Sequence, residues 1–169
     1  MATLAELAGA NGPLKKLDPV LDPDDPNAQE ERLIYGSERF VTWVETRLPG
    51  LGSTWDIEVA PDQQVDALFE VYTSGEVLTY QWQFKSINPI GEGVWELKTA
   101  DIRIFGWFHA LDCFIAVVAD TKQNILDHRL YAGYRGTVVH YRNQLTLDEP
   151  KFVQGDDPNA VVSNYTLPN

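Results

Sequence analysis

The stretch from residue 94 to residue 122 constrains the fold more than any other part of this sequence. It contains three strand-like runs, at residues 94–98, 102–109 and 113–119, with connections of only three residues each. Connections this short suit antiparallel neighbours and are too short for the crossover between parallel strands. The third run is apolar at every position, which is typical of a strand buried on both faces. The sequence therefore predicts an antiparallel meander at the centre of the fold.

Helical and strand patterns also occur on both sides of this meander. Apolar spacing and end signals predict three helices, over residues 38–48, 61–73 and 131–145. Residues 77–85 alternate strictly between apolar and polar side chains, which predicts a half-buried strand. A shorter strand is expected at residues 55–59. The element order is therefore helices and strands mixed along the chain, with the meander between the second and third helix.

This order predicts one α+β domain over residues 32–147. We expect an antiparallel sheet of about four strands, with helices packed on one face. The flanking segments, residues 1–31 and 148–169, are rich in proline and acidic residues. Such composition indicates an acidic N-terminal tail or strap and an acidic C-terminal tail. The chain of 169 residues is long enough for a domain with a substantial core.

The chain is strongly acidic, with a formal net charge of −12. Such a charge opposes binding to nucleic-acid backbones, because that binding relies on neutralising phosphates. The charge is unevenly distributed, however. Residues 94–147 carry six basic and five acidic residues, whereas residues 1–31 carry seven acidic residues and two lysines. A large basic surface is therefore excluded, but a small cationic pocket near the meander is compatible with the sequence.

Cys113 is the only cysteine, so no disulfide can form within the chain. The sequence shows no signal peptide and no apolar run close to the roughly 20 residues of a membrane-spanning helix. We therefore expect a cytoplasmic protein without membrane contact. His109, Asp112 and Cys113 cluster near a tight turn, but their spacing matches no standard metal site. No metal ion or cofactor is expected.

The meander carries the motifs by which this chain resembles a known family. Residues 95–98 (Trp-Glu-Leu-Lys) and 101–105 (Asp-Ile-Arg-Ile-Phe) resemble the RelE/HigB-like toxin superfamily, particularly its phage-derived branch. Its members show an L/W-E-L-R/K strand, an x-x-R-x-F strand, an apolar strand and then a lysine, which Lys122 matches. In element order the resemblance covers roughly residues 62–145, and it implies a RelE-like fold.

This resemblance implies a ribosome-dependent mRNA endonuclease of a toxin–antitoxin module. The ribosome with its mRNA and an antitoxin would then be the partners. Carried over by position, the basic catalytic residues would be Arg103, Lys98 and Lys122, and looser candidates are His109 and Tyr131. Cleavage of RNA through its 2′-hydroxyl needs a base, cations for the developing phosphate charge, and an acid for the leaving oxygen. Side chains of these types can supply such groups.

The net charge favours a second interpretation, which we rank slightly ahead. In it, a phage- or prophage-related protein on a toxin-like scaffold binds and inhibits or modulates a host protein that has a basic surface. The residues expected to form the acidic binding face are Glu58, Asp62, Asp66 and Glu70. The two interpretations differ in what the folded protein must contain. The nuclease requires a cationic concavity around Arg103, whereas the binding protein requires the acidic face.

Glu96 and Lys98 permit further interpretations. With Asp62 they match a metal-dependent nuclease motif, but Asp62 begins a helix, where that motif needs a strand edge. We favour an exposed row on a strand, paired across to Arg103 or Asp101, and a buried Glu96–Arg103 ion pair is an alternative. Core packing is expected for most of the nearby aromatic residues, with base stacking as the alternative. These aromatic residues are Tyr80, Trp82, Phe84, Trp95, Phe105, Trp107 and Phe108.

Overall fold

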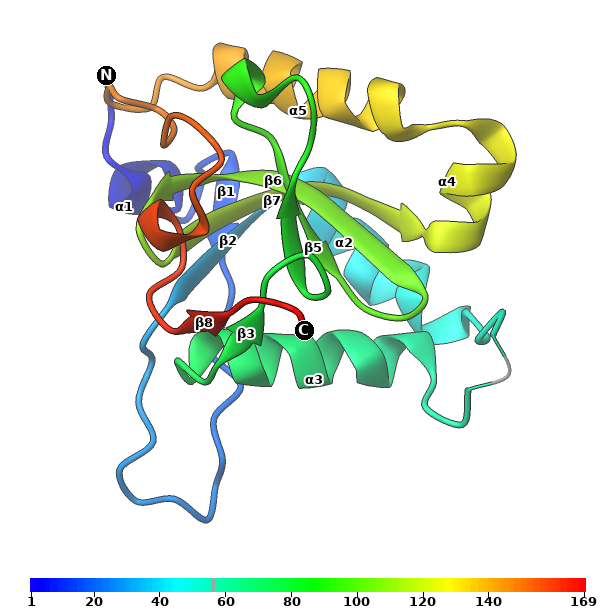
Figure 1. Ribbon diagram of the computed structural model, residues 1–169. Coiled ribbons are helices and arrows are strands. Elements are labelled where there is room, and N and C mark those ends of the chain that lie inside the picture. Colours follow the sequence, from blue (N-terminus) through cyan, green and yellow to red (C-terminus); the bar gives the residue numbers. More distant parts are fainter. Residues whose placement is uncertain (56) are drawn as a thin grey trace.

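A computed structural model describes residues 1–55 and 57–169, and it confirms an α+β fold (Figure 1). A six-stranded sheet crosses the middle of the molecule in the order β1-β2-β7-β6-β5-β4. Its strands are β1 (Leu14–Lys16), β2 (Leu33–Ser37), β4 (Phe84–Ser86), β5 (Trp95–Lys98), β6 (Ile102–Ala110) and β7 (Cys113–Thr121). A second, two-stranded sheet pairs β3 (Leu78–Thr79) with β8 (Tyr165–Thr166).

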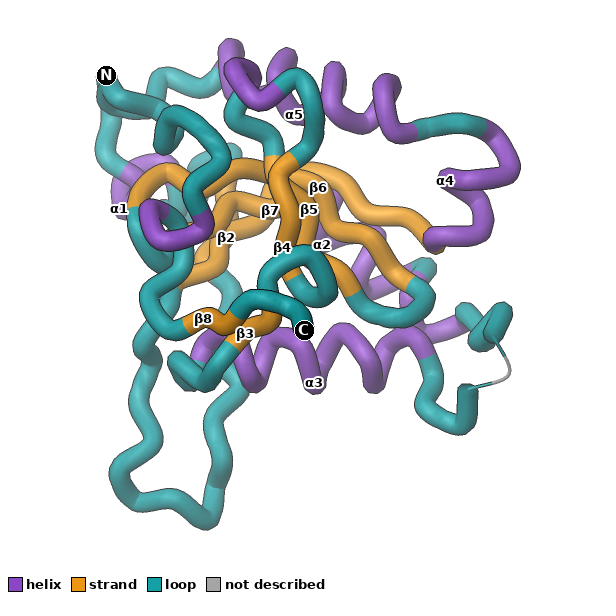
Figure 2. The backbone as a smooth tube through the Cα atoms, viewed as in Figure 1, coloured by secondary structure: helices purple, strands orange, loops and turns teal. Residues whose placement is uncertain are grey.

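Helices cover both faces of the large sheet, so the prediction of helices on one face is wrong. The helices are α1 (Leu4–Leu7), α2 (Glu38–Thr46), α3 (Pro61–Thr73), α4 (Lys122–His128) and α5 (Tyr131–Gln144), with 3-10 turns at Leu48–Gly50, Ile90–Glu92 and Pro158–Ala160. One core cluster lies between the sheet and α2 and α3, and the other lies between the sheet and α1, α4 and α5. Figure 2 shows α3 and α5 on opposite sides of the strands. The central strands are apolar on both faces, so each face requires a covering layer.

The predicted meander is confirmed as the antiparallel strands β5, β6 and β7. Alternation along β6 sends Ile104 into the cluster under α3 and Phe105 into the cluster under α5. Ile115 and Ala116 of β7 divide in the same way between the two clusters. This alternation assigns the side chain of Arg103 to the α5 side of the sheet, and it thereby positions the candidate site.

The sheet is larger than predicted and is not purely antiparallel. The strand β2 lies beside β7 and runs parallel to it, with Leu33 opposite Cys113. The helix α2 follows β2 directly, and its N-cap is Ser37, whose hydroxyl accepts a hydrogen bond from the Phe40 amide at 3.1 Å. Parallel pairing needs a long connection, so the two partners lie far apart in sequence. A local pattern of five residues cannot reveal such a partner.

The alternating segment 77–85 does not form one strand. It divides into β3 and β4, which are separated by a turn in which Gln81 has a φ of 74°. The Gln83 side chain accepts a hydrogen bond from the Thr79 amide at 2.7 Å, so a polar residue of the alternating pattern stabilises the turn. Trp82 is consequently 63% exposed instead of buried. The strand expected at residues 55–59 includes residue 56, which lies outside the described residues, and its described neighbours form turns and bends.

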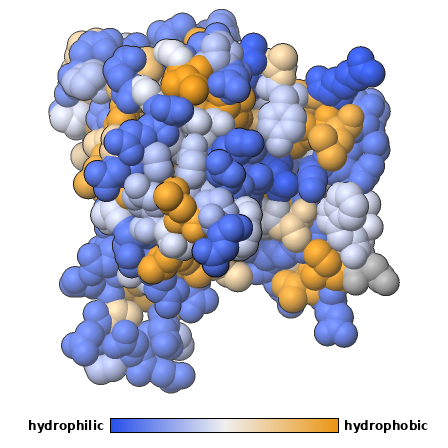
Figure 3. All heavy atoms as spheres, in the orientation of Figure 1, coloured by the Kyte–Doolittle hydropathy of each residue, from blue (hydrophilic) through white to orange (hydrophobic). Residues whose placement is uncertain are grey.

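Both terminal segments contribute elements to the packed structure. Residues 1–31 contain α1 and the edge strand β1, whereas residues 22–30 project from the body of the molecule as a hydrophilic loop (Figures 1 and 3). In the C-terminal segment, Val161 and Val162 are fully buried in the cluster under α2 and α3. Hydrophobic side chains in each segment therefore hold the ends of the chain against the domain.

A glycine in β6 provides a test of the sheet geometry. A Cβ atom on Gly106 would lie 2.0 Å from the Ile115 carbonyl oxygen, at a β-bulge between β6 and β7. We expect Gly106→Ala to lower the free energy of unfolding by about 1–3 kcal/mol, measured by urea denaturation. The matched control is Gly133→Ala in α5, where a Cβ meets nothing within 4 Å. This control should raise stability by about 0.5–1 kcal/mol. An unchanged Gly106→Ala midpoint would contradict the close approach of β6 and β7.

Candidate functional site

A pocket of about 330 Å³ lies on the α5 side of the sheet, at the end of β5 and the start of β6. Its charged side chains are four basic ones and one acidic one. We call it the cationic pocket and define it by Lys85, Glu96, Lys98, Arg103, Lys122 and Tyr131. It is the concavity around Arg103 that the nuclease interpretation requires. Positive charge collects here although the chain as a whole has a net charge of −12.

The register of the sheet brings these residues together. Lys85 of β4 lies opposite Glu96 of β5, and Lys98 of β5 lies opposite Arg103 of β6. Residues two positions apart on one strand share a face, so Glu96 and Lys98 point to the same side. Lys122 begins α4 directly after β7, and its amide donates a hydrogen bond to the Asp101 carbonyl at 2.7 Å. The pocket is therefore assembled from β4, β5, β6 and the first residues of α4 and α5.

Two atoms of the pocket are buried without a hydrogen-bond partner. Glu96 is 3% exposed and Arg103 is 6% exposed. Among the described residues, no donor reaches Oε2 of Glu96 and no acceptor reaches Nε of Arg103. The other end of the Arg103 guanidinium is fixed, because Nη1 donates to the carbonyls of Thr99 and Ile102. Leaving buried polar groups unpaired costs free energy, so each such group calls for a partner, which a bound ligand can supply.

The pocket changes the acid–base properties of three side chains. Burial raises the pKa of Glu96, although the positive charges of Arg103 and Lys98 partly oppose this rise. Burial lowers the pKa of Lys98, although the negative charge of Glu96 partly opposes this shift, and the neighbouring positive charges add to it. Burial and the negative charge of Glu96 raise the pKa of Tyr131 to about 12. The Tyr131 hydroxyl approaches both side chains, but it forms no hydrogen bond with Oε2 of Glu96 or Nε of Arg103. Perturbed groups that share one cavity are typical of functional sites.

The structure brings together the three basic residues that the resemblance implied for catalysis and one of its two looser candidates. Lys98, Arg103 and Lys122 line the cationic pocket, and the looser candidate Tyr131 joins them. His109 does not, because it lies six residues along β6 from Arg103, a distance of roughly 20 Å for an extended strand. The Nδ1 atom of His109 is instead 2.9 Å from the Lys151 carbonyl. His109 therefore has no place in this pocket.

Sequence reasoning placed Glu96 incorrectly and missed Lys85. The expected exposed row on β5 is wrong for Glu96, because this side chain is buried. The alternative of a close Glu96–Arg103 ion pair is not formed among the described residues. Lys85 could not be assigned to the pocket because its strand was predicted with different bounds. Glu96 lies opposite Phe105 in the sheet, and this strand pairing, which a local sequence pattern does not show, places its side chain in the buried part of the sheet.

The residues expected to form an acidic face lie on and before α3. Asp66 and Glu70 are exposed one helical turn apart, Asp62 is partly exposed in the first turn, and Glu58 is exposed in the preceding loop. Glu70 also lines a small hollow of about 200 Å³ beside the projecting loop. The other acidic residues of this hollow are Asp22, Asp25, Glu31 and Glu76. Negative charge therefore gathers on the α3 side of the sheet, away from the cationic pocket.

The cluster around Cys113 shows no sign of reactivity. Cys113 is buried at the start of β7, and burial raises the pKa of its thiol to about 12, so the thiolate is not populated near neutral pH. Within the described part of the chain, no three His, Cys, Asp or Glu side chains are grouped so that they could hold a metal ion. Asp112, next to this cysteine, pairs with Arg32 and accepts a hydrogen bond from the Ser163 amide. Its contacts are those of a structural residue.

Comparison of the chain with protein-family models, with curated proteins and with solved structures found no match. In residues 1–55 and 57–169, no helix has the length and apolar character that crossing a membrane requires.

Proposed function

We propose that the chain is a toxin-type RNA endonuclease whose phosphate-binding and cleavage site is the cationic pocket. The observation that carries this proposal is the pair of unpartnered buried atoms, Oε2 of Glu96 and Nε of Arg103, in one cavity with three lysines. A phosphodiester next to a ribose 2′-hydroxyl would supply the partners that these atoms lack. The phosphate accepts hydrogen bonds from the guanidinium, and the hydroxyl donates one to the carboxylate.

The proposed reaction uses the side chains of the pocket. The Glu96 carboxylate takes the proton of the 2′-hydroxyl, and the 2′-oxygen attacks phosphorus. Arg103 and Lys122 stabilise the negative charge that develops on the phosphate oxygens. The bond from phosphorus to the 5′-oxygen breaks, and Lys98, whose pKa is lowered, donates the proton that the leaving oxygen needs. The products are a 2′,3′-cyclic phosphate and a 5′-hydroxyl, so atoms and charge balance.

The acidity of the whole chain does not prevent this chemistry. Electrostatic interactions in salt solution extend about 8 Å at physiological ionic strength. The projecting loop and the outer side of α3 carry much of the negative charge, on the other side of the sheet from the cationic pocket. The local balance of four basic residues against one acidic residue therefore dominates at the site. The residual repulsion limits binding to one short segment of RNA.

A cellular experiment tests the proposal. Induced expression of the wild type in bacteria should arrest growth and produce new mRNA 5′ ends. The double variant Lys98→Ala with Arg103→Ala should produce at least about 100-fold fewer such ends, since loss of one charge-stabilising donor alone lowers rates by about 10²–10³. The matched control is Lys15→Ala with Arg129→Ala, which removes two exposed basic residues outside the pocket. This control should cleave like the wild type.

Unchanged mRNA ends in cells that contain folded wild-type protein would overturn the proposal. The second candidate function, binding of a basic host protein, would then take its place. The specific observation that favours it is the acid-lined hollow and the exposed Asp66 and Glu70 of α3. Under that alternative, Asp66→Lys with Glu70→Lys would release a partner that the Lys98→Ala, Arg103→Ala variant still binds.

A further inference from the structure

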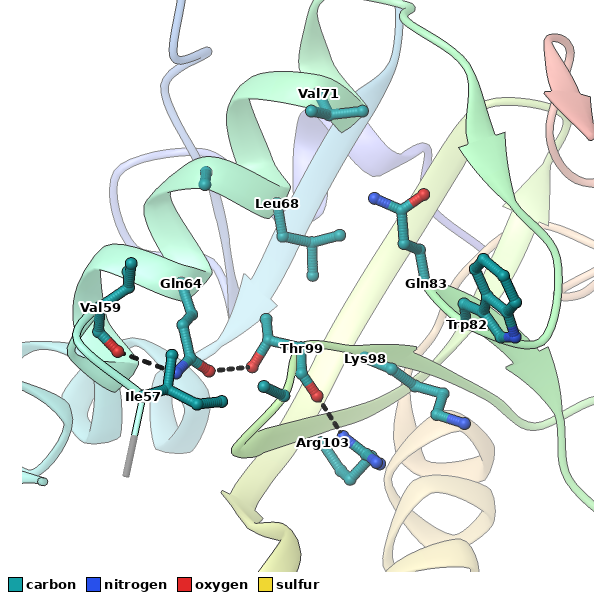
Figure 4. A pocket seen from close by; sticks show the side chains of 12 residues that line it. Ile57, Val59, Gln64, Leu68, Val71, Trp82, Gln83, Lys98, Thr99 and Arg103 are labelled. Atoms are coloured by element: carbon teal, nitrogen blue, oxygen red, sulfur yellow. Dashed lines mark hydrogen bonds between the residues drawn. The ribbon is translucent and has the colours of Figure 1, made fainter. Parts of the chain in front are cut away.

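A second hollow, of about 620 Å³, opens beside the cationic pocket. Figure 4 shows Leu68 and Val71 of α3 on one side of it and Trp82 on the other, with Ile57 and Val59 at the end near the start of α3. We call it the apolar pocket and define it by Ile57, Val59, Ala67, Leu68, Val71 and Trp82. Hydrophobic atoms reach the surface near the loop that precedes α3 (Figure 3). Its volume lies in the range of sites that hold small organic groups.

The polar groups at the end of the apolar pocket are already paired with each other. The Gln64 side-chain amide donates to the Val59 carbonyl at 3.0 Å and to Asp101 at 2.6 Å. Its oxygen accepts from the Thr99 hydroxyl at 2.9 Å, as the dashed lines of Figure 4 indicate in part. The pocket therefore offers a ligand apolar contact area rather than free hydrogen-bonding groups. A flat, largely apolar ring suits such a surface.

The exposed indole of Trp82 is held in place by the cationic pocket. The turn between β3 and β4 contains Gln81 in the left-handed region, and the Gln81 carbonyl accepts a hydrogen bond from Nζ of Lys98 at 2.8 Å. The Lys98 amide also donates to the Gln83 carbonyl at 2.8 Å. Two bonds from one lysine therefore fix the turn that presents Trp82. Of the seven aromatic residues considered for base stacking, five are buried and Trp82 is the one with most of its surface exposed.

The two pockets share a boundary, because Lys98 and Arg103 line both of them. A ligand that spans this boundary needs an anionic group on one side and a flat apolar ring on the other. We propose that the apolar pocket binds a nucleobase of single-stranded RNA, stacked on Trp82, while the adjacent phosphate occupies the cationic pocket. This inference rests on the proposed function and adds the substrate class, an unpaired strand, because a base inside a duplex cannot reach the indole.

Binding of a short single-stranded 2′-O-methyl RNA, which cannot be cleaved, tests the inference. Its affinity for the wild type should exceed that for Trp82→Ala by roughly 5- to 150-fold, the range of one base–aromatic stack. Trp82→Phe keeps an aromatic ring and should retain most of the affinity. The matched control is Leu126→Ala, another exposed apolar residue that lines neither pocket, and it should bind like the wild type.

An abasic version of the same strand separates the contribution of the base to the affinity from the contribution of the phosphate. The abasic strand should bind the wild type as weakly as the normal strand binds Trp82→Ala. The abasic strand should also bind Trp82→Ala and the wild type with equal affinity. Equal affinity of both strands for the wild type, or equal affinity of Trp82→Ala and the wild type, overturns the inference. If affinity depends on Arg103 but not on Trp82, the inference fails and the proposed function stands. If no strand binds the wild type, both fail.

Discussion

Glu96→Gln is expected to make the protein more stable and, at the same time, far less active. Glu96 is buried in the cationic pocket, and its pKa is raised mainly by burial. A carboxylate with a raised pKa is held in its charged form at a cost, and glutamine has the same shape without the charge. The same substitution removes the proposed base for the 2′-hydroxyl. Cleavage should fall by about 10²–10⁴-fold.

The pH dependence of stability gives this prediction a second readout. A group whose pKa is raised by folding contributes its stability below its unfolded pKa, near 4.3, and loses it as the pH rises through the folded pKa. The free energy of unfolding of the wild type should therefore decline in this window, and Glu96→Gln should lack this decline. Urea denaturation from about pH 4 to pH 8 measures it.

The control, Asp66→Asn, alters an exposed carboxylate and should change neither property. Lower stability of Glu96→Gln at neutral pH would contradict the burial argument, and undiminished cleavage would exclude Glu96 as the base.

Arg32→Met is expected to destabilise the protein more than any surface substitution. Arg32 is 0% exposed, and its guanidinium donates to the carbonyls of Tyr72 at 3.0 Å, Glu76 at 2.9 Å and Asn164 at 3.0 Å. Its Nε lies 3.3 Å from Oδ1 of Asp112 in an ion pair that lacks hydrogen-bond geometry. One side chain thus connects β2 with the end of α3, the β6–β7 turn and the C-terminal segment. Its loss leaves several carbonyls and a carboxylate without a partner.

The expected loss in the free energy of unfolding is about 3–5 kcal/mol, the usual effect of breaking a buried charged network. Such a loss is a large share of the 5–15 kcal/mol that stabilises a typical domain. Guanidinium or urea denaturation measures it.

The control is Lys16→Met, which removes an exposed ion pair with Glu30 at 2.7 Å and should change stability by less than about 1 kcal/mol. Limited proteolysis of Arg32→Met should also release the C-terminal segment. A loss below about 1 kcal/mol would show that the other contacts hold these segments without Arg32.

The sequence predicted the elements whose signals are local. The meander has short connections and apolar runs, and the helices α2, α3 and α5 have regular apolar spacing with a cap or a proline at the start of two of them. It did not predict β2, because this strand pairs in parallel with a distant strand. It also predicted a single strand at residues 77–85, because alternation cannot distinguish two strands from one when a polar side chain of the pattern, Gln83, stabilises the intervening turn.

The basic residues of the candidate site were predictable, but the burial of its side chains was not. The resemblance implied Lys98, Arg103 and Lys122 by their positions, and all three line one pocket. Burial of Glu96 depends on which elements pack over β5. The position of Tyr131 beside the pocket depends on the path of the chain from α4 to α5. Neither is visible in a sequence window. The role of Trp82 was hidden for the opposite reason, because its pattern indicated a buried strand residue and the turn exposes it.

We propose that an RNA phosphate binds at Nε of Arg103, which has no hydrogen-bond partner among the described residues. The most direct measurement is an NMR titration of the ¹⁵N-labelled protein with adenosine 3′-monophosphate, following the arginine Nε–H resonances. The claim predicts that the Arg103 Nε–H resonance moves with increasing nucleotide, together with the backbone amides of Lys98 and Lys122. The Nε–H of Arg142, buried against Phe152 outside this pocket, should stay in place. An unmoved Arg103 resonance at nucleotide concentrations that shift other parts of the protein would contradict the account.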